Sequence, residues 1–524
     1  MHRLCLALLC LALAWSAAAR AGRPADRWWG HVRFLADDAL EGRETGSAGH
    51  RKAAEYVAAA FAAAGLQPAG TDGYFQPIAF EARQLVEERS RLAIVRDGAE
   101  DPVALGDAAI VSIRVPPAAE IDAPLAFIGY GLSLPELGHD DLEGIDLKGR
   151  MAVIVSGAPA TLSGPIPAHA SSTRWGALRN AGAVGTVTIQ RTSDVPWERI
   201  KARRLSAVKR LVGDPLGDGP GQQLAVTVNP AQAEQWFTGS GRTAAEILSL
   251  ASARQPLPRF QLQGRLKGTL VTTSTPLQSD NVVGVLPGTD GQLAREYVVL
   301  TAHLDHVGRG EPVKGDSIYN GAMDNASGTA TLLEVARRLR ESGARLRRSV
   351  VFLSVTAEEH GLLGSRYFTA RPTIPAPAVV ANLNIDMFLP LFPMRSLIVN
   401  GVEESDLADD VHRVARVAGI EIYTDPEPER NAFVRSDQYS FVRRGVPAVA
   451  FKVGWKAGSP EHEIVKRWRA ERYHAPSDDL DQPIDLQAAE DFTRFYTALA
   501  EAVANRDTRP RWNDGSFFRR VAEE

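Results

Sequence analysis

The sequence predicts a mixed α/β fold, a central sheet with helices on both faces, together with an inserted β-rich module. Two patterns predict it. From residue 279 onward, apolar runs of strand length alternate with amphipathic helical segments, an order typical of a sheet that carries helices on both faces. Between residues 123 and 268, short apolar runs are instead separated by turns that contain Gly and Pro, as in β-rich modules.

Helices and then extended runs lead the chain. A first helix is expected around Trp28 and Leu35, with Asp26 as its N-cap. A second helix is expected over residues 48–64, and extended runs follow over residues 76–113.

The second half alternates strands and helices. In chain order we expect strands at 281–286 and 296–302, a helix at 326–341, strands at 349–356, 379–387 and 397–400, a helix at 406–418, a strand at 448–451 and a helix at 486–505. The first helix of this series has Leu332, Val335 and Leu339 on one face. Gly343 follows it as a stop.

The first 21 residues have the pattern of a signal peptide. His2 and Arg3 make a basic start, and an apolar run over residues 4–15 leads into small residues. A run of 12 residues is too short for a bilayer core of about 30 Å, which takes about 20 residues. We therefore expect export to the periplasm or the extracellular medium, without stable membrane insertion after the signal is removed.

These patterns divide the chain into segments. We expect a signal peptide at 1–21, a main domain formed by 22–120 and 268–508, an inserted module at 121–267 and a C-terminal tail at 509–524. The main domain is thus discontinuous in sequence.

The composition excludes several classes of function. There are 59 Lys and Arg against 63 Asp and Glu, a net charge of −4, so no basic excess indicates nucleic-acid binding. Cys5 and Cys10 are the two cysteines, and both lie in the expected signal. The mature chain would then have no thiol for a nucleophile or a thiolate metal site. The sequence carries no indication of an oligomeric state.

Potential ligands for a hard metal ion occur in five places, at the ends of predicted strands or in nearby loops. They are His303 with Asp305 in TAHLDHVG, Asp324 in GAMDNASG, Glu358 and Glu359 in TAEEHGLLGS, Asp386 in NLNIDM, and His474 in RYHAPSDD. Open α/β sheets bind ligands at the carboxyl ends of their strands. Two imidazoles and three carboxylates suffice for two zinc-class ions if one carboxylate is shared, since each ion then has three protein ligands and an open position.

One carboxylate of the paired glutamates then remains available for general acid–base catalysis. Adjacent residues in an extended segment point in opposite directions, so one of Glu358 and Glu359 can ligate while the other accepts the proton of an activated water. Taken alone, His303 would more often be a structural histidine and Asp324 a helix cap. A purely structural role for all of these residues would require five separate coincidences, each placing a suitable ligand at an edge of the same sheet. His306 and His360 flank the motifs and are expected to be neighbours rather than ligands.

The series of motifs resembles the co-catalytic di-zinc aminopeptidase family, which also contains glutamate carboxypeptidases, glutaminyl cyclases and the transferrin receptor. The resemblance covers about residues 26–100 and 275–505 and rests on seven blocks in family order: TAHLDHVG, GAMDNASG, TAEEHGLLGS, NLNIDM, SDQYSF, GVPAVAF and YHAPSDD. The segment GYGLSLPELGHDDLEGIDLKGRMAVIVSGAP resembles the protease-associated domain that is often inserted in these enzymes.

The resemblance implies a role for each site residue. His303 and Asp386 would hold one zinc ion, Glu359 and His474 the other, Asp324 would bridge them, Glu358 would be the general base, and Asp305 would orient the imidazole of His303. It also implies a cis peptide bond between Asp324 and Asn325. Where the family has Ser-Asp-His, this chain has Ser436, Asp437 and Gln438, so the contact made by that histidine must differ.

The sequence therefore predicts an exported exopeptidase with two Zn²⁺ ions per chain, which hydrolyses the N-terminal bond of peptides with a di-zinc-activated hydroxide and a glutamate base. A carboxypeptidase or dipeptidase on the same site is an alternative, with Arg435 as the candidate to bind a terminal carboxylate. A receptor or scaffold that keeps the fold without catalysis is a second alternative, and it need not hold zinc.

Overall fold

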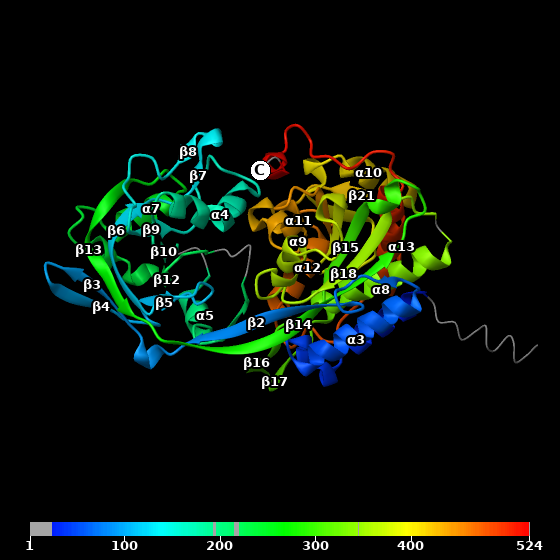
Figure 1. Ribbon diagram of the computed structural model, residues 1–524, viewed down its shortest axis with the longest axis horizontal. Coiled ribbons are helices and arrows are strands. Elements are labelled where there is room, and N and C mark those ends of the chain that lie inside the picture. Colours follow the sequence, from blue (N-terminus) through cyan, green and yellow to red (C-terminus); the bar gives the residue numbers. More distant parts are fainter. Residues whose placement is uncertain (1–23, 192–194, 214–218, 344, 523–524) are drawn as a thin grey trace, which may run out of the picture. The chain divides into compact units, whose positions relative to one another are not determined.

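The computed structural model describes residues 24–191, 195–213, 219–343 and 345–522, which form two compact units (Figure 1). Within the described residues, the first unit comprises the chain up to Ile78, Gln278–Pro426 and the chain from Arg435 onward. The second comprises Ala79–Leu277 and Glu427–Val434. The expected signal peptide lies outside the described residues.

The first unit is built on a mixed sheet. In spatial order its strands are the start of β2 (Phe75–Leu85), the end of β14 (Thr272–Leu286), β18 (Ser349–Val355), β15 (Tyr297–His303), β19 (Val379–Ile385), β22 (Ala448–Val453), β20 (Ser396–Asn400) and β21 (Glu421–Tyr423), and β1 (Gln67–Pro68) also pairs with β14. The central strands β18, β15, β19 and β22 are parallel. Their neighbours β14 and β20 are antiparallel to them, so the predicted mixed sheet is confirmed.

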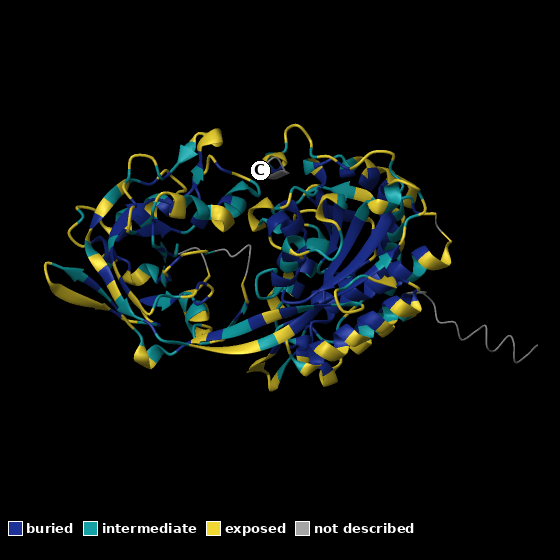
Figure 2. Cartoon of the chain, viewed as in Figure 1, coloured by how far each residue is buried: buried dark blue, intermediate teal, exposed yellow. Residues whose placement is uncertain are grey.

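Helices cover both faces of this sheet. One face packs on α2 (Pro24–Leu35), α3 (Ala48–Ala63), α8 (Ser327–Glu341), α10 (Leu407–Ala418), α12 (Pro460–Glu471) and α13 (Leu486–Ala504), and the other on α9 (Leu363–Ala370) and α11 (Gln438–Val442). Within β15, Val298 and Leu300 join the first core and Val299 the second, because alternate residues of a strand point to opposite faces. The central strands are accordingly buried (Figure 2).

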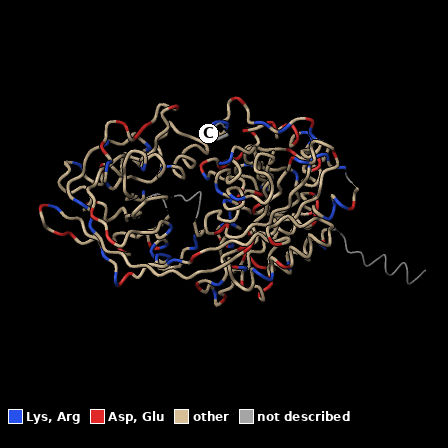
Figure 3. Tube along the Cα trace, in the orientation of Figure 1, with Lys and Arg blue, Asp and Glu red and all other residues tan. Residues whose placement is uncertain are grey.

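The second unit is a β-rich module with its own sheet. Its strand order is β4 (Ala99–Val103), β3 (Arg91–Arg96), β13 (Arg259–Thr269), β6 (Glu120–Ile128), β9 (Met151–Val155), β10 (Gly185–Ile189), β12 (Leu224–Val228) and β5 (Ala109–Val111). Its helices are α4 (Ile166–Asn180), α5 (Trp197–Ala202), α6 (Glu234–Phe237) and α7 (Ala244–Ser252). Strand β11 (Val208–Leu211) pairs with residues 80–83 of β2. Acidic and basic residues are interspersed along both units (Figure 3).

The boundaries of the units differ from the expected ones. The second unit begins at Ala79 rather than at residue 121, because β3, β4 and β5 join its sheet. Its main segment extends to Leu277 rather than to residue 267. The extended pattern over residues 76–113 does not specify which sheet the strands enter, and only their pairing partners decide it.

The C-terminal segment is part of the first unit rather than a separate tail. Trp512 pairs with Ser405 in an isolated bridge, and its indole donates to the carbonyl of Gly445 at 2.9 Å. Phe518 is fully buried. Across the described residues, no helix combines the length and apolarity that a membrane crossing requires.

A buried carboxylate links α8 to α2. Glu334 of α8 is 1% exposed and lies 2.8 Å from Nη2 of Arg337, 3.6 Å from Nε2 of His31 and 3.7 Å from Nε of Arg27. Burial raises the pKa of Glu334, but the nearby imidazole of His31 and the hydrogen bond from Arg337 lower it more, to about 2. A carboxyl group with a depressed pKa stabilises the folded state above its ordinary value of 4.5, and the stabilisation is lost as the pH falls through the folded value.

We expect Glu334→Gln to lower the free energy of unfolding by about 1–3 kcal/mol at neutral pH, with a smaller difference near about pH 3. Urea unfolding of both proteins at the two pH values measures this. Glu341→Gln is the matched control, because Glu341 is the exposed partner of the same Arg337 and should change little. An equal loss for Glu334→Gln at both pH values would contradict the linkage.

Candidate metal centre

Three neighbouring strands carry expected ligands to one edge of the sheet of the first unit. His303 is the last residue of β15, Glu358 and Glu359 follow β18, and Asp386 follows β19. Because these strands pair in parallel, their carboxyl ends meet at one edge. Loops bring Asp324, just before α8, and His474, after α12, to the same place.

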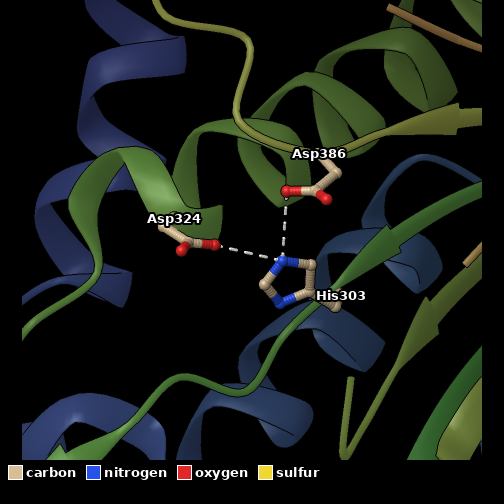
Figure 4. A group of neighbouring side chains, drawn as sticks. All are labelled: His303, Asp324 and Asp386. Atoms are coloured by element: carbon tan, nitrogen blue, oxygen red, sulfur yellow. Dashed lines mark ion pairs between the residues drawn. The ribbon is translucent and has the colours of Figure 1, made fainter. Parts of the chain in front are cut away.

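The first ligand group contains His303, Asp324 and Asp386 (Figure 4). Nε2 of His303 lies 3.3 Å from Oδ1 of Asp324 and 3.4 Å from Oδ1 of Asp386. Two ligands of one tetrahedral zinc ion lie roughly 3.3 Å apart. Nε2 of His303 and Oδ1 of Asp386 are buried without a hydrogen-bond partner in the described part of the chain, so these atoms fit a metal ion.

The second group contains His474, Asp324 and Glu359. Nε2 of His474 lies 3.2 Å from Oδ2 of Asp324 and 3.1 Å from Oε2 of Glu359, again close to the separation of two zinc ligands. Asp324 thus presents one oxygen to each imidazole, which is the geometry of a bridging carboxylate.

The loop that carries Asp324 is held from both sides. Asp478 accepts hydrogen bonds from the amides of Met323 and Asp324 at 2.9 and 3.0 Å. The fully buried Arg43 donates to the carbonyl of Asn320 at 2.7 Å. The peptide bond between Asp324 and the next residue is cis, as expected.

Asp305 contacts His303 as expected, but through its main chain. Nδ1 of His303 lies 3.0 Å from the backbone oxygen of Asp305, not from its carboxylate. The carboxylate accepts from the amides of Glu358 and Glu359 at 3.0 and 3.3 Å and from the hydroxyl of Thr45 at 3.2 Å. The imidazole is therefore oriented by the main chain of Asp305, while its side chain fixes the segment of the paired glutamates.

Glu358 belongs to neither ligand group. Burial raises its pKa well above the ordinary value, His303 opposes this, and the nearby Glu359 and Asp386 add to it. A carboxylate with a raised pKa is a better proton acceptor near neutral pH.

His306 lies closer to the ligands than a mere flanking residue would. Nδ1 of His306 is 2.8 Å from Oε1 of Glu359 and 4.0 Å from Oδ2 of Asp324, and its side chain is fully buried. The three residues also satisfy the spacing of a metal-binding group. Two imidazoles, those of His306 and His474, therefore approach Glu359.

Arg43, Asp478 and Gln438 were not predicted as parts of the site. Asp478 lies in the YHAPSDD block, which offered a signal, whereas Arg43 is not in any ligand pattern. Oε1 of Gln438 accepts from Nδ2 of Asn384 at 2.8 Å. Gln438, which stands where the family has histidine, thus anchors the end of β19 just before Asp386.

Imidazole and carboxylate ligands that share one carboxylate at the strand ends of a mixed sheet are the arrangement of a metal-dependent hydrolase. Residues 281–500 match the family described as Peptidase family M28.

The chain is also similar in sequence to named relatives and in fold to a solved structure. The chain is 27% identical to aminopeptidase YwaD of Bacillus subtilis over 255 residues, which is 48% of this chain and 50% of YwaD. It is 29% identical to aminopeptidase NAALADL1 of Rattus norvegicus over 176 residues, 33% of this chain and 21% of that protein. The matches thus span half or less of these relatives. The fold is similar to that of an aminopeptidase from Aneurinibacillus sp. strain AM-1, with a TM-score of 0.52 and 18% identity over 93% of this chain and 94% of that chain.

Replacing Asp324 with Asn should weaken zinc binding in both groups, because an amide is a poorer ligand than a carboxylate and Asp324 contributes to both. Asp386→Asn should weaken only one. Zinc per chain after dialysis, measured by mass spectrometry, distinguishes them. Asp409→Asn, at an exposed position of α10, is the control. Full zinc content in Asp324→Asn would exclude the bridging role.

Proposed function

We propose that this chain is an exported zinc exopeptidase that removes the N-terminal residue of peptides. In this proposal one zinc ion is held by His303, Asp324 and Asp386, and a second by Asp324, Glu359 and His474. Glu358 is the general base.

The observation that carries the proposal is the placement of Asp324 between two imidazoles. Its oxygens lie 3.3 Å from His303 and 3.2 Å from His474, so a single carboxylate can serve two ions. A scaffold that does not bind metal has no need for this complete set of buried and partly buried ligands, which argues against the receptor alternative.

The residues around the ions supply the rest of the chemistry. When bound, the two zinc ions would activate a water molecule and polarise the carbonyl group of the scissile bond. Glu358, free of either ligand group, accepts the proton of the attacking water and delivers it to the leaving amine. The carboxylate of Asp305 holds Glu358 in place by accepting a hydrogen bond from the backbone amide of Glu358.

The preference for the amino end is supported by the names of the two relatives given above, which are aminopeptidases. Two other relatives, from Arabidopsis thaliana, are named probable glutamate carboxypeptidases. A carboxypeptidase or dipeptidase would need a cation for the terminal carboxylate. Arg435 is exposed and gives that alternative no specific support.

Export is proposed from the signal-like pattern of the first 21 residues. The second unit is proposed to be a protease-associated domain. In support, the segment 129–159 that resembles this domain contributes β7 (Ser133–Leu134), β8 (His139–Asp140) and β9 to the second unit.

The paired glutamates should respond differently to the same substitution. Glu358→Gln should keep both zinc ions while turnover falls by roughly 10²- to 10⁴-fold, because the proton acceptor is lost. Glu359→Gln should lose affinity for one ion, and its activity should recover in part when zinc is raised. Metal analysis and peptide hydrolysis across a zinc titration measure both effects.

The reverse pattern, with metal lost from Glu358→Gln and kept in Glu359→Gln, would exchange the two roles. Full activity in both variants would show that this is not the catalytic site.

The substrate direction can be read from matched peptides. Peptides with a free amino terminus should be hydrolysed at the first bond, whereas their N-acetylated counterparts should resist, because a blocked amine cannot bind a zinc ion or a carboxylate of the site. Chromatography of the released amino acids is the measurement. Release from the carboxyl end of N-acetylated peptides would favour the carboxypeptidase alternative.

A further inference from the structure

His306 is the buried imidazole that the proposed mechanism leaves unused. It follows β15 by three residues and contacts Glu359, the ligand that His474 also approaches. One of the two imidazoles can bind a metal ion together with Glu359 and Asp324. The distances from each imidazole to these two carboxylates indicate which one does.

His474 approaches both carboxylates, as a ligand of an ion shared with them would, whereas His306 comes within hydrogen-bond distance of Glu359 alone. Nε2 of His474 lies 3.2 and 3.1 Å from the carboxylates of Asp324 and Glu359, near the roughly 3.3 Å of two ligands on one zinc ion. Nδ1 of His306 lies 2.8 Å from Oε1 of Glu359 but 4.0 Å from Asp324. The short distance is that of an N–H···O bond.

The two imidazoles also use different oxygens of Glu359. His474 faces Oε2 and His306 faces Oε1. A carboxylate can only accept a hydrogen bond, so the proton lies on Nδ1 of His306, and that nitrogen is not free to bind a metal. With Oε1 engaged, Glu359 offers Oε2 to the ion.

The packing around His306 keeps the ring in this orientation. A Cβ atom on Gly321 would lie 2.5 Å from Cγ of His306, so the ring is in close contact with the loop that carries Asp324. The rings of His306 and His474 meet edge to face at a centroid distance of 5.5 Å.

We propose that His306 is a positioning residue for the second metal ion: its Nδ1–H holds Oε1 of Glu359 so that Oε2 alone faces the ion held with His474. The inference rests on the proposed two-zinc site. Hydrogen-bonding partners of metal ligands typically contribute 10- to 100-fold to metal affinity.

The test is a zinc titration of the full-length, metal-depleted protein against a chromophoric chelator. His306→Ala should weaken the binding of one of the two ions by about 10- to 100-fold and leave the other unchanged. His306→Asn should restore most of this affinity, because its amide nitrogen occupies nearly the position of Nδ1 and can donate to Oε1. His474→Ala should lose the ion more completely. His412→Ala, at an exposed position of α10, should bind both ions as the unmodified protein does.

Unchanged binding of two ions by His306→Ala would overturn the inference and leave the proposed function intact. Equal losses in His306→Ala and His306→Asn, with retention of the ion in His474→Ala, would overturn it in favour of His306 as the ligand. Failure of the unmodified protein to bind a second ion would instead refute the proposed function. Melting temperatures of the metal-free variants distinguish a loss of zinc affinity from a folding defect. The inference requires that metal-free His306→Asn have the melting temperature of the unmodified protein.

Discussion

The parallel pairing of β18, β15 and β19 is the constraint on which the site depends. Parallel strands end at the same edge, so the residues that follow them are brought together whatever their distance along the chain. His303, Glu358 and Asp386 each follow or end one of these strands. Both faces of the strands are packed against helices, which leaves the strand ends as the place where polar side chains can gather.

Gathering so many carboxylates in a buried place requires compensation, because like charges at short range repel and a buried charge loses its hydration. The imidazoles of His303 and His474 lie between the carboxylates. The fully buried guanidinium of Arg43 adds a positive charge and donates hydrogen bonds to the backbone carbonyls of Leu304, Asn320 and Gly321. Zinc ions in the proposed positions would complete the balance, and the atoms of His303 and Asp386 that lack a hydrogen-bond partner belong to the proposed position of the first ion.

The main chain does much of the positioning at this centre. The carboxylate of Asp305 binds the amides of both paired glutamates, and that of Asp478 binds the amides of the loop that carries Asp324. A carboxylate that accepts hydrogen bonds from two successive backbone amides fixes a short segment rather than one side chain. Asp305 and Asp478 therefore each orient the neighbouring ligands of one segment together. The ligand loops are thereby tied to one another as well as to the sheet.

The sequence predicts the alternation of strands and helices, the mixed sheet and the set of candidate ligands, because these follow from local periodicity and from residue types at strand ends. It could not locate the boundary at Ala79, since strand pairing depends on distant partners. It gives His306 no role beyond that of a neighbour, does not specify which atoms of Asp305 orient His303, and carries no signal for Arg43. These features follow from the folded arrangement, because the contacts of a buried ring, carboxylate or guanidinium depend on loops that are far apart in the chain and meet at one edge of the sheet.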